Sequence, residues 1–248
     1  VEQMVEELQA SDFEPIAFEL GFGPKEELPP VRLQVDGITV AISGFVDRVD
    51  GWVHDGRLYV RVMDYKTGHK SFDLTDVWHG LNLQMLLYLF TLEEKGLPGE
   101  ERPIVPAGVL YLPAREEHLT GSRNMDPEKR QKELDSKLRR SGLILNDPNV
   151  IDAMEHVPLG SDARFLPVRI SKRTGAISGD ALASAVQLGK LQKHIHRILR
   201  DIAREIGGGN IQADPWYRDE QRTACRWCDY ASACHFEDGR GGERSRYL

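Results

Sequence analysis

The chain has 248 residues, of which 40% are hydrophobic and 29% charged, an ordinary composition for a globular protein. Its net charge of −7 argues against binding of nucleic acid by bulk positive charge, though not against a local basic groove. No apolar run approaches the ~18 residues that a membrane helix needs, and the start lacks the features of a signal peptide. We therefore expect a cytoplasmic protein without membrane contact, whose first residues continue a helix of a longer chain.

Short hydrophobic runs and turn residues predict a strand-rich first half. We expect a helix over residues 1–10 and a strand over 13–22. Four further β-rich runs should pair as two hairpins, at 32–35 with 38–45 and at 49–53 with 58–64. Their turns contain Asp36-Gly37 and Asp55-Gly56, and an Asp-Gly pair between two such runs is a strong hairpin signal.

The middle of the chain predicts a helix, a strand and an insertion. Apolar residues at helical spacing predict one helix over 75–94, and 105–112 predicts a further strand. Residues 113–165 are more polar and irregular, so we expect a helical insertion at the edge of the core, with helices near 127–140 and 148–155.

The last third predicts a strand over 168–170 and a long amphipathic helix over 179–206. We divide the chain into a core of residues 1–206 and a cysteine-bearing tail of residues 207–248. The order of strands and helices predicts an α/β protein with a mixed central sheet flanked by helices.

Two acidic residues lie near the ends of neighbouring strands. Strand pairing could bring Asp47 and Asp64 side by side, where two carboxylates repel unless a cation lies between them. Oxygen ligands suit Mg²⁺ or Mn²⁺, and the carbonyl of Tyr65 could serve as a third ligand. Lys66 lies two residues after Asp64 on the same strand face, where an ammonium could stabilise developing phosphoryl charge.

A structural explanation competes with this catalytic one. Acidic residues at strand ends are usually turn or capping residues, and an Asp-x-Lys is usually a surface ion pair. The hairpin setting and the following helix favour catalysis, because Gln84 and Tyr88 share one helix face and Gln84 is polar within an apolar helix. Tyr88 taken alone is better explained as a core aromatic.

These residues together resemble the RecB-type branch of the PD-(D/E)XK nucleases, which are metal-dependent DNases with a mixed sheet flanked by helices. The motifs that carry the resemblance are Gly44…Asp47-Arg48-Val49-Asp50, Asp64-Tyr65-Lys66-Thr67-Gly68 and Gln84-x-x-x-Tyr88. The resemblance implies that Asp47 and Asp64 bind metal and that Lys66 is the catalytic lysine. Gln84 and Tyr88 would support the site, and Glu19 resembles the upstream acidic residue of this branch.

The three cysteines lie within ten positions, at Cys225, Cys228 and Cys234. An odd number of clustered thiols favours metal or iron–sulfur ligation over a disulfide framework. Either a fourth ligand lies outside this sequence, or His235 completes a Cys₃His zinc site. In both cases we expect the three cysteines to converge within one loop, whether the site is empty, binds zinc or forms a disulfide between two of them.

The tail also resembles the C-terminal nuclease domains of the AddB family, in which three such cysteines and one far upstream hold a [4Fe–4S] cluster. The resemblance implies a metal-dependent deoxyribonuclease domain of a helicase–nuclease that processes double-strand DNA ends for recombinational repair. Its substrate would be single-stranded DNA from an unwound duplex end, and its partner an AddA-like helicase–nuclease subunit. The alternatives are another iron–sulfur RecB-type exonuclease of the CRISPR-associated kind, a non-catalytic DNA-end-binding module, or a zinc-binding module.

Candidate DNA contacts must work against the negative net charge. Two basic groups are available, although most such runs are solvated helix faces: Lys129, Arg130, Lys132, Lys137, Arg139 and Arg140, then Lys190, Lys193, Arg197 and Arg200. His194 and His196 are expected to be surface residues. Trp52, Trp78 and Trp216 could stack on bases, but we expect them to pack in the core.

Overall fold

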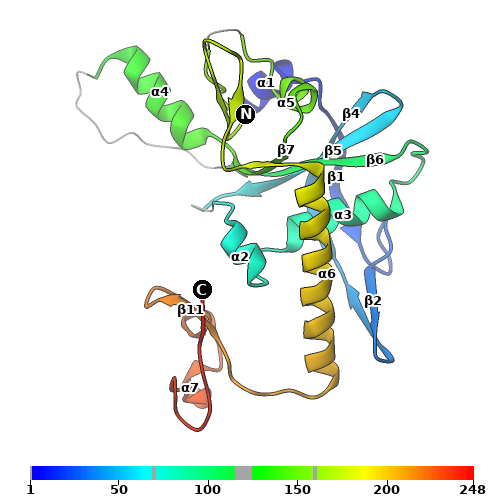
Figure 1. Ribbon diagram of the computed structural model, residues 1–248, viewed down its shortest axis with the longest axis vertical. Coiled ribbons are helices and arrows are strands. Elements are labelled where there is room, and N and C mark those ends of the chain that lie inside the picture. Colours follow the sequence, from blue (N-terminus) through cyan, green and yellow to red (C-terminus); the bar gives the residue numbers. More distant parts are fainter. Residues whose placement is uncertain (1, 69–70, 115–124, 159–160) are drawn as a thin grey trace.

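The computed structural model describes residues 2–68, 71–114, 125–158 and 161–248. Its centre is a six-stranded mixed sheet in the order β1-β4-β5-β6-β7-β10. Helices α1 and α5 lie on one side of this sheet, and α2, α3 and α6 lie on the other (Figure 1). The predicted mixed sheet flanked by helices is confirmed. In the described part of the chain, no helix has the length and apolar content needed to cross a membrane.

The first half contains hairpins at the two predicted places, but the strand predicted over 38–45 ends at Ile42, and Gly44 and Phe45 begin the following strand. Its elements are α1 (Glu2–Gln9), β1 (Glu14–Phe22), β2 (Val31–Val35), β3 (Ile38–Ile42), β4 (Gly44–His54) and β5 (Arg57–Lys66). Asp36 and Gly37 turn the first hairpin with φ of 50° and 83°, the left-handed conformation that such a turn requires. This hairpin forms a separate two-stranded sheet that contacts α6, whereas β4 and β5 pair antiparallel within the central sheet.

The single helix predicted over 75–94 is wrong, because the structure has two helices, α2 (Leu74–Trp78) and α3 (Gln84–Lys95). Between them Gly80 and Asn82 adopt φ of 87° and 55°, which no α-helix accommodates. Asn82 Nδ2 donates a hydrogen bond to Asp76 Oδ2 over 3.0 Å and so fixes the turn. The apolar spacing continues through both helices, which is why the break does not show in the periodicity.

The second half completes the central sheet. Its elements are β6 (Ile104–Pro113), α4 (Pro127–Leu138), β7 (Ser141–Leu145), α5 (Pro148–Met154), β8 (Arg169–Ile170), β9 (Ile177–Ser178), β10 (Leu182–Ala183) and α6 (Ala185–Gly207). The segment 113–165, of which 115–124 and 159–160 lie outside the described residues, supplies β7 between β6 and β10 and is therefore more than an edge insertion. Helix α6 begins later than predicted, because Leu182 and Ala183 pair with β7 and Ser184 then caps the helix.

The tail is a small unit below the sheet in Figure 1. It contains β11 (Trp216–Asp219), β12 (Arg222–Thr223), the 3₁₀ helix η1 (Ala224–Trp227), α7 (Ala231–Cys234) and β13 (Arg246–Tyr247). Arg218 of β11 donates to Asp73 Oδ2 at 3.2 Å and to Asp76 Oδ1 at 2.8 Å. Both carboxylates belong to the start of α2, so this guanidinium joins the tail to the core.

A charged network is fully buried between β4 and β5. Arg48, Asp50 and Arg61 have no solvent exposure. Asp50 Oδ2 accepts hydrogen bonds from Arg48 Nη2 at 2.8 Å and from Arg61 Nε at 2.9 Å. The remaining face of Arg61 lies over the Phe13 ring, 5.0 Å from its centroid. One carboxylate therefore neutralises parts of two buried guanidinium groups.

Asp50→Asn should lower the free energy of unfolding by about 3–5 kcal/mol, because it leaves two buried guanidinium groups without their counter-charge. Urea denaturation measures this. Glu237→Gln is the control, since its partner Arg240 is exposed and the pair should contribute almost nothing. Equal stability of the two variants would contradict the role given to Asp50.

Helix α3 packs on the start of β4. The rings of Phe22 and Tyr88 stack with centroids 4.6 Å apart. Gly44 lies beneath Tyr88 so closely that a Cβ at this position would overlap the Tyr88 hydroxyl oxygen, while the next ring atom, Cζ, would be 3.1 Å away. The glycine therefore sets how near α3 lies to the sheet.

Gly44→Ala should cost about 1–3 kcal/mol of stability by overpacking. In the double variant with Tyr88→Phe, which removes the overlapping oxygen, the cost should be smaller than the sum of the two single costs. Urea denaturation of all four proteins gives this coupling. Strictly additive costs would show that the hydroxyl is not what excludes a Cβ.

Candidate active site

The pairing of β4 with β5 ends beside Asp47. The last ladder pair is Arg48 with Met63. One residue further on, the Asp47 carboxylate takes over the role of a backbone carbonyl and accepts a hydrogen bond from the Tyr65 N–H at 2.7 Å. The side chain of Asp47 is thereby held next to the backbone that joins Asp64 to Lys66.

Asp64 and Lys66 form an ion pair on one face of β5. The Asp64 Oδ2 atom is buried and accepts no well-directed hydrogen bond within the described residues. The side chains keep 16% and 28% exposure, so the pair is partly open to solvent. A nearly enclosed carboxylate oxygen of this kind suits a cation, and Lys66 supplies that charge here.

Tyr111 of β6 lies next to Asp64 in the parallel pairing of β5 with β6. The Lys66 ammonium lies 5.4 Å from the centroid of the Tyr111 ring. Burial, together with the charges of Asp64 and Asp76, raises the pKa of Tyr111 to about 12. Two carboxylates from different elements therefore create negative potential at this end of the sheet, which favours a bound cation.

Gln84 and Tyr88 lie over the start of β4. Burial raises the pKa of the Tyr88 hydroxyl, and a hydrogen bond with Gln84 offsets part of the rise. Gly44, which both side chains approach, precedes Asp47 by three residues on the same strand. Among the described residues, no hydrogen bond connects Gln84 or Tyr88 to Asp47 or Asp64.

Glu19 occupies the neighbouring strand β1. The pairs Phe18–Arg48 and Leu20–Val46 place Glu19 opposite Asp47 in the ladder. Its φ of 48° is left-handed, an uncommon conformation for a glutamate, and its side chain is exposed. Adjacent strands therefore present Glu19, Asp47 and Asp64 in one row.

The donors present fit a hard divalent cation, since Asp47 and Asp64 offer carboxylate oxygens at one end of a hairpin. Within the described ranges, however, no three His, Cys, Asp or Glu side chains come close enough to form a complete metal-binding group. A cation bound here would need the backbone carbonyl of Tyr65, water or substrate to complete its coordination. The roles of these residues remain predictions.

The three cysteines, which we expect to converge within one loop, lie in one short stretch of the tail. All three thiols are free, with Cys225 half-buried and Cys228 and Cys234 exposed. They form no group of three with one another or with His235 in this part of the structure. Cys225 lies within the 3₁₀ helix η1 and Cys228 follows as its C-cap, while Cys234 ends a separate helix, α7. Their role as metal ligands stays a prediction.

Sequence reasoning missed Tyr111, Asp76 and Arg218. Tyr111 reaches Asp64 only through the parallel pairing of β5 with β6, for which the sequence carries no local signal. Asp76 lies near the candidate site because the helix ends before Gly80. Gly80 and Asn82, both residue types that adopt positive φ, were the sequence signal for that break.

Comparison with known proteins agrees with this geometry. The family model of the PD-(D/E)XK nuclease superfamily matches residues 1–235. Three similar proteins are each named as a subunit of an ATP-dependent helicase/deoxyribonuclease. The one from Acetivibrio thermocellus is 33% identical over 235 residues, covering 94% of this chain and 20% of that protein. The one from Ruminiclostridium cellulolyticum is 31% identical, covering 99% and 21%, and the one from Clostridium botulinum is 34% identical, covering 98% and 21%.

The chain thus spans about a fifth of the length of the curated relatives it matches. The sheet order, the paired strand ends that carry Asp47 and Asp64, and the match over nearly the whole chain agree with one another. On this evidence the chain belongs to the PD-(D/E)XK nuclease superfamily.

Proposed function

We propose that this chain is the deoxyribonuclease domain of a helicase–nuclease and hydrolyses phosphodiester bonds of DNA at the end of the β4–β5 hairpin. The observation that carries the proposal is the Asp64–Lys66 ion pair with the Asp47 carboxylate held beside it. The names of the similar proteins, which describe parts of an ATP-dependent helicase/deoxyribonuclease, support the same activity. Residues 1–206 would be the catalytic core and residues 207–248 a separate tail.

The metal would be Mg²⁺ or Mn²⁺, bound by Asp47, Asp64 and the carbonyl of Tyr65. Such an ion polarises the phosphoryl group and lowers the pKa of bound water. The hydrogen bond from Tyr65 N–H orients the Asp47 carboxylate, so that this ligand is positioned before any ion arrives. Glu19 lies opposite Asp47 on β1 and could hold a water molecule that coordinates the metal.

Lys66 would act on the developing negative charge of the phosphoryl group. Without substrate its ammonium neutralises Asp64. With a metal ion held by Asp47 and Asp64, the Lys66 ammonium would be free to pair with a phosphate oxygen, and this interaction would strengthen as negative charge builds up there. Gln84 and Tyr88 would hold α3 against the start of β4 and so support Asp47 from behind.

The substrate would be single-stranded DNA from an unwound duplex end, delivered by an AddA-like helicase–nuclease subunit during repair of double-strand breaks. The names of the relatives, which are about five times longer than this chain, support only a subunit of an ATP-dependent helicase/deoxyribonuclease. The single-stranded substrate and the AddA-like partner come from the family resemblance.

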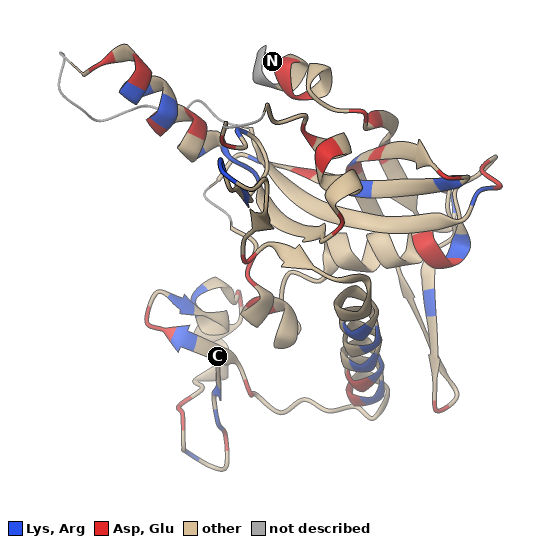
Figure 2. Ribbon diagram, turned by 45° about the horizontal axis from the view of Figure 1, so that its top comes forward, with Lys and Arg blue, Asp and Glu red and all other residues tan. Residues whose placement is uncertain are grey.

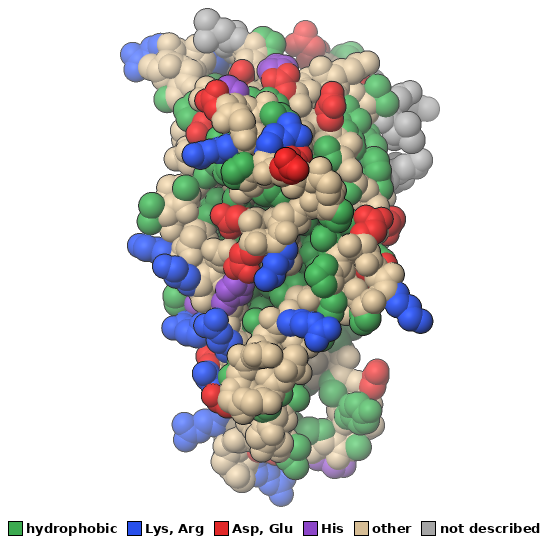
Figure 3. All heavy atoms as spheres, turned by 90° about the vertical axis from the view of Figure 1, so that its right-hand side faces the viewer, with side chains coloured by type: hydrophobic (Ala, Val, Ile, Leu, Met, Phe, Trp, Pro, Cys, Tyr) green, Lys and Arg blue, Asp and Glu red, His purple; other side chains and the backbone are tan. Residues whose placement is uncertain are grey.

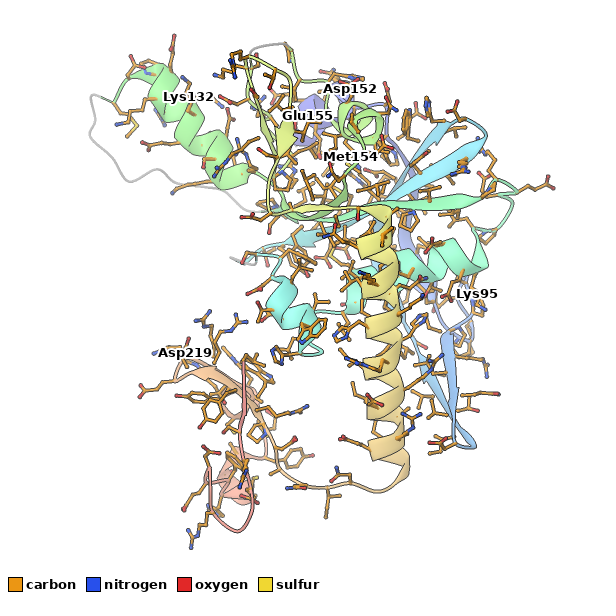
Figure 4. All side chains as sticks on the ribbon, in the orientation of Figure 1. Lys95, Lys132, Asp152, Met154, Glu155 and Asp219 are labelled. Atoms are coloured by element: carbon orange, nitrogen blue, oxygen red, sulfur yellow. The ribbon has the colours of Figure 1, made fainter. Side chains whose placement is uncertain are left out.

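Lys66→Ala should lower the rate of Mg²⁺-dependent DNA cleavage about 10²–10³-fold, because it removes one charge that stabilises the transition state. Binding of DNA measured with Ca²⁺ should change less than about threefold, and urea denaturation should show an intact fold. Lys95→Ala is the matched control, since Lys95 is exposed at the far end of α3 (Figure 4). Cleavage by Lys66→Ala within tenfold of wild type would remove Lys66 from the mechanism.

For the cysteines we keep the sequence-based proposal that Cys225, Cys228 and Cys234 bind a [4Fe–4S] cluster with a fourth thiol from an upstream part of a longer protein. Since the described thiols form no metal-binding group of three as they lie, the tail would have to rearrange around the cluster. A longer protein with an upstream cysteine, purified without oxygen, should be brown, and Cys228→Ala should bleach it. A colourless, iron-free protein would contradict the proposal and favour structural zinc.

A further inference from the structure

Trp78, at the end of α2, does not pack in the core as its type predicts. Its side chain is 60% exposed. One face of the indole stacks on the imidazole of His194 from α6, with ring centroids 4.0 Å apart and planes 10° from parallel. The ring is therefore both open to solvent and held at a fixed angle.

Two hydrogen bonds fix His194 beneath the indole. Its Nε2 lies 2.9 Å from the carbonyl oxygen of Trp78, and its Nδ1 lies 3.0 Å from Arg197 Nη2. A guanidinium only donates, so Nδ1 accepts and Nε2 donates, which assigns the neutral Nε2–H form to this buried imidazole. The second face of Trp78 is thus presented on a rigid support.

This face borders a pocket of about 480 Å³ between the α2–α3 turn, α6 and the tail. Apolar side chains such as Ile198 and Trp216 line it, together with the acidic Glu205. Asp201 and Arg246 also line the pocket, so its wall combines apolar surface with charges of both signs and suits the flat ring of a nucleobase and its amino groups. Trp78 and the three residues after it line the pocket and form the turn that leads from α2 to Gln84 at the start of α3.

Phosphates have a complementary surface on the solvent side of α6. Lys190, Lys193, Arg197 and Arg200 follow one another at spacings of three or four residues and so share one exposed helix face. We call this set the α6 basic stripe, and Figure 2 shows the Lys and Arg residues recurring along the helix. Within the described residues none of the four pairs with a carboxylate, whereas Arg204, next along, is paired with Asp36 and Asp201.

We propose that Trp78, supported by His194, is a base-stacking platform for single-stranded DNA and that the phosphates of the same strand run along the α6 basic stripe. The proposal rests on the nuclease function proposed above and adds where the strand is held. Stacking on an exposed aromatic ring serves every base, so this site would bind DNA without regard to sequence. A local basic stripe also explains how a chain of net charge −7 can bind a polyanion.

The test is binding of a fluorescently labelled oligothymidylate in EDTA, where no cleavage occurs. Trp78→Ala should weaken binding about tenfold, a loss of about 1.4 kcal/mol that falls within the range for one stacked base. Trp78→Phe, which keeps a ring, should stay within about threefold of wild type. Trp227→Ala is the matched control, because Trp227 is 77% exposed but lies in the tail, and it should change binding less than twofold.

The basic stripe predicts a second readout. A plot of log affinity against log salt concentration has a negative slope. Replacing Lys193 and Arg200 together by Ala should make this slope less steep by about 1.4, the value for two lost phosphate contacts to a single strand. Trp78→Ala should leave that slope unchanged, because it removes stacking and no charge.

Cleavage measured in Mg²⁺ separates this proposal from the proposed function. If wild type does not cleave but Trp78→Ala loses binding, the nuclease assignment fails and the platform stands. If wild type cleaves and Trp78→Ala binds the oligonucleotide as tightly as wild type, the platform is overturned. Unchanged binding together with loss of association with another protein would identify the exposed indole as a protein-docking site instead.

Discussion

The register of β4 against β5 is the constraint on which the candidate site depends, and the buried Asp50 holds that register. Burial lowers the pKa of Arg48, but Asp50 together with Tyr65 and Glu7 raises it, so the pKa lies above its ordinary value and the group stays charged. A slip of one residue would turn every side chain of β4 to the opposite face and separate Asp50 from Arg61. The alignment that satisfies this network also brings Asp47 to the Tyr65 N–H.

The end of this hairpin concentrates negative charge in a partly enclosed place. Asp64 pairs with the cationic Lys66, and the hydroxyl of Tyr111 is kept protonated by its burial and by the carboxylates around it. Under the proposed function, such a site would take up a divalent cation before it takes up DNA. The cation in turn would make the site attractive to phosphate, so the order of binding follows from electrostatics.

Outside this site the charges of the two signs are interspersed, as the face shown in Figure 3 illustrates. No broad positive field is therefore available on that face to draw in DNA, and local features must do so.

The tail is joined to the core through Arg218, which forms ion pairs with Asp73 and Asp76 at the start of α2. Because Asp76 also fixes the turn that leads into Gln84, the tail and the candidate site are connected through a single short helix.

The sequence by itself determined the features that depend on near neighbours. The Asp-Gly turns and the β-rich runs on either side of them follow from steric and hydrogen-bonding rules that act over a few residues. The resemblance of those motifs to a nuclease family was likewise readable, and the family match confirms it. Only the tertiary structure decided that α2 and α3 are separate, that β7 joins the sheet and that Tyr111 lies beside Asp64. It also decided that Trp78 is exposed and stacked on His194, because this outcome depends on packing between α2 and α6, which are distant in the chain and which no local pattern brings together.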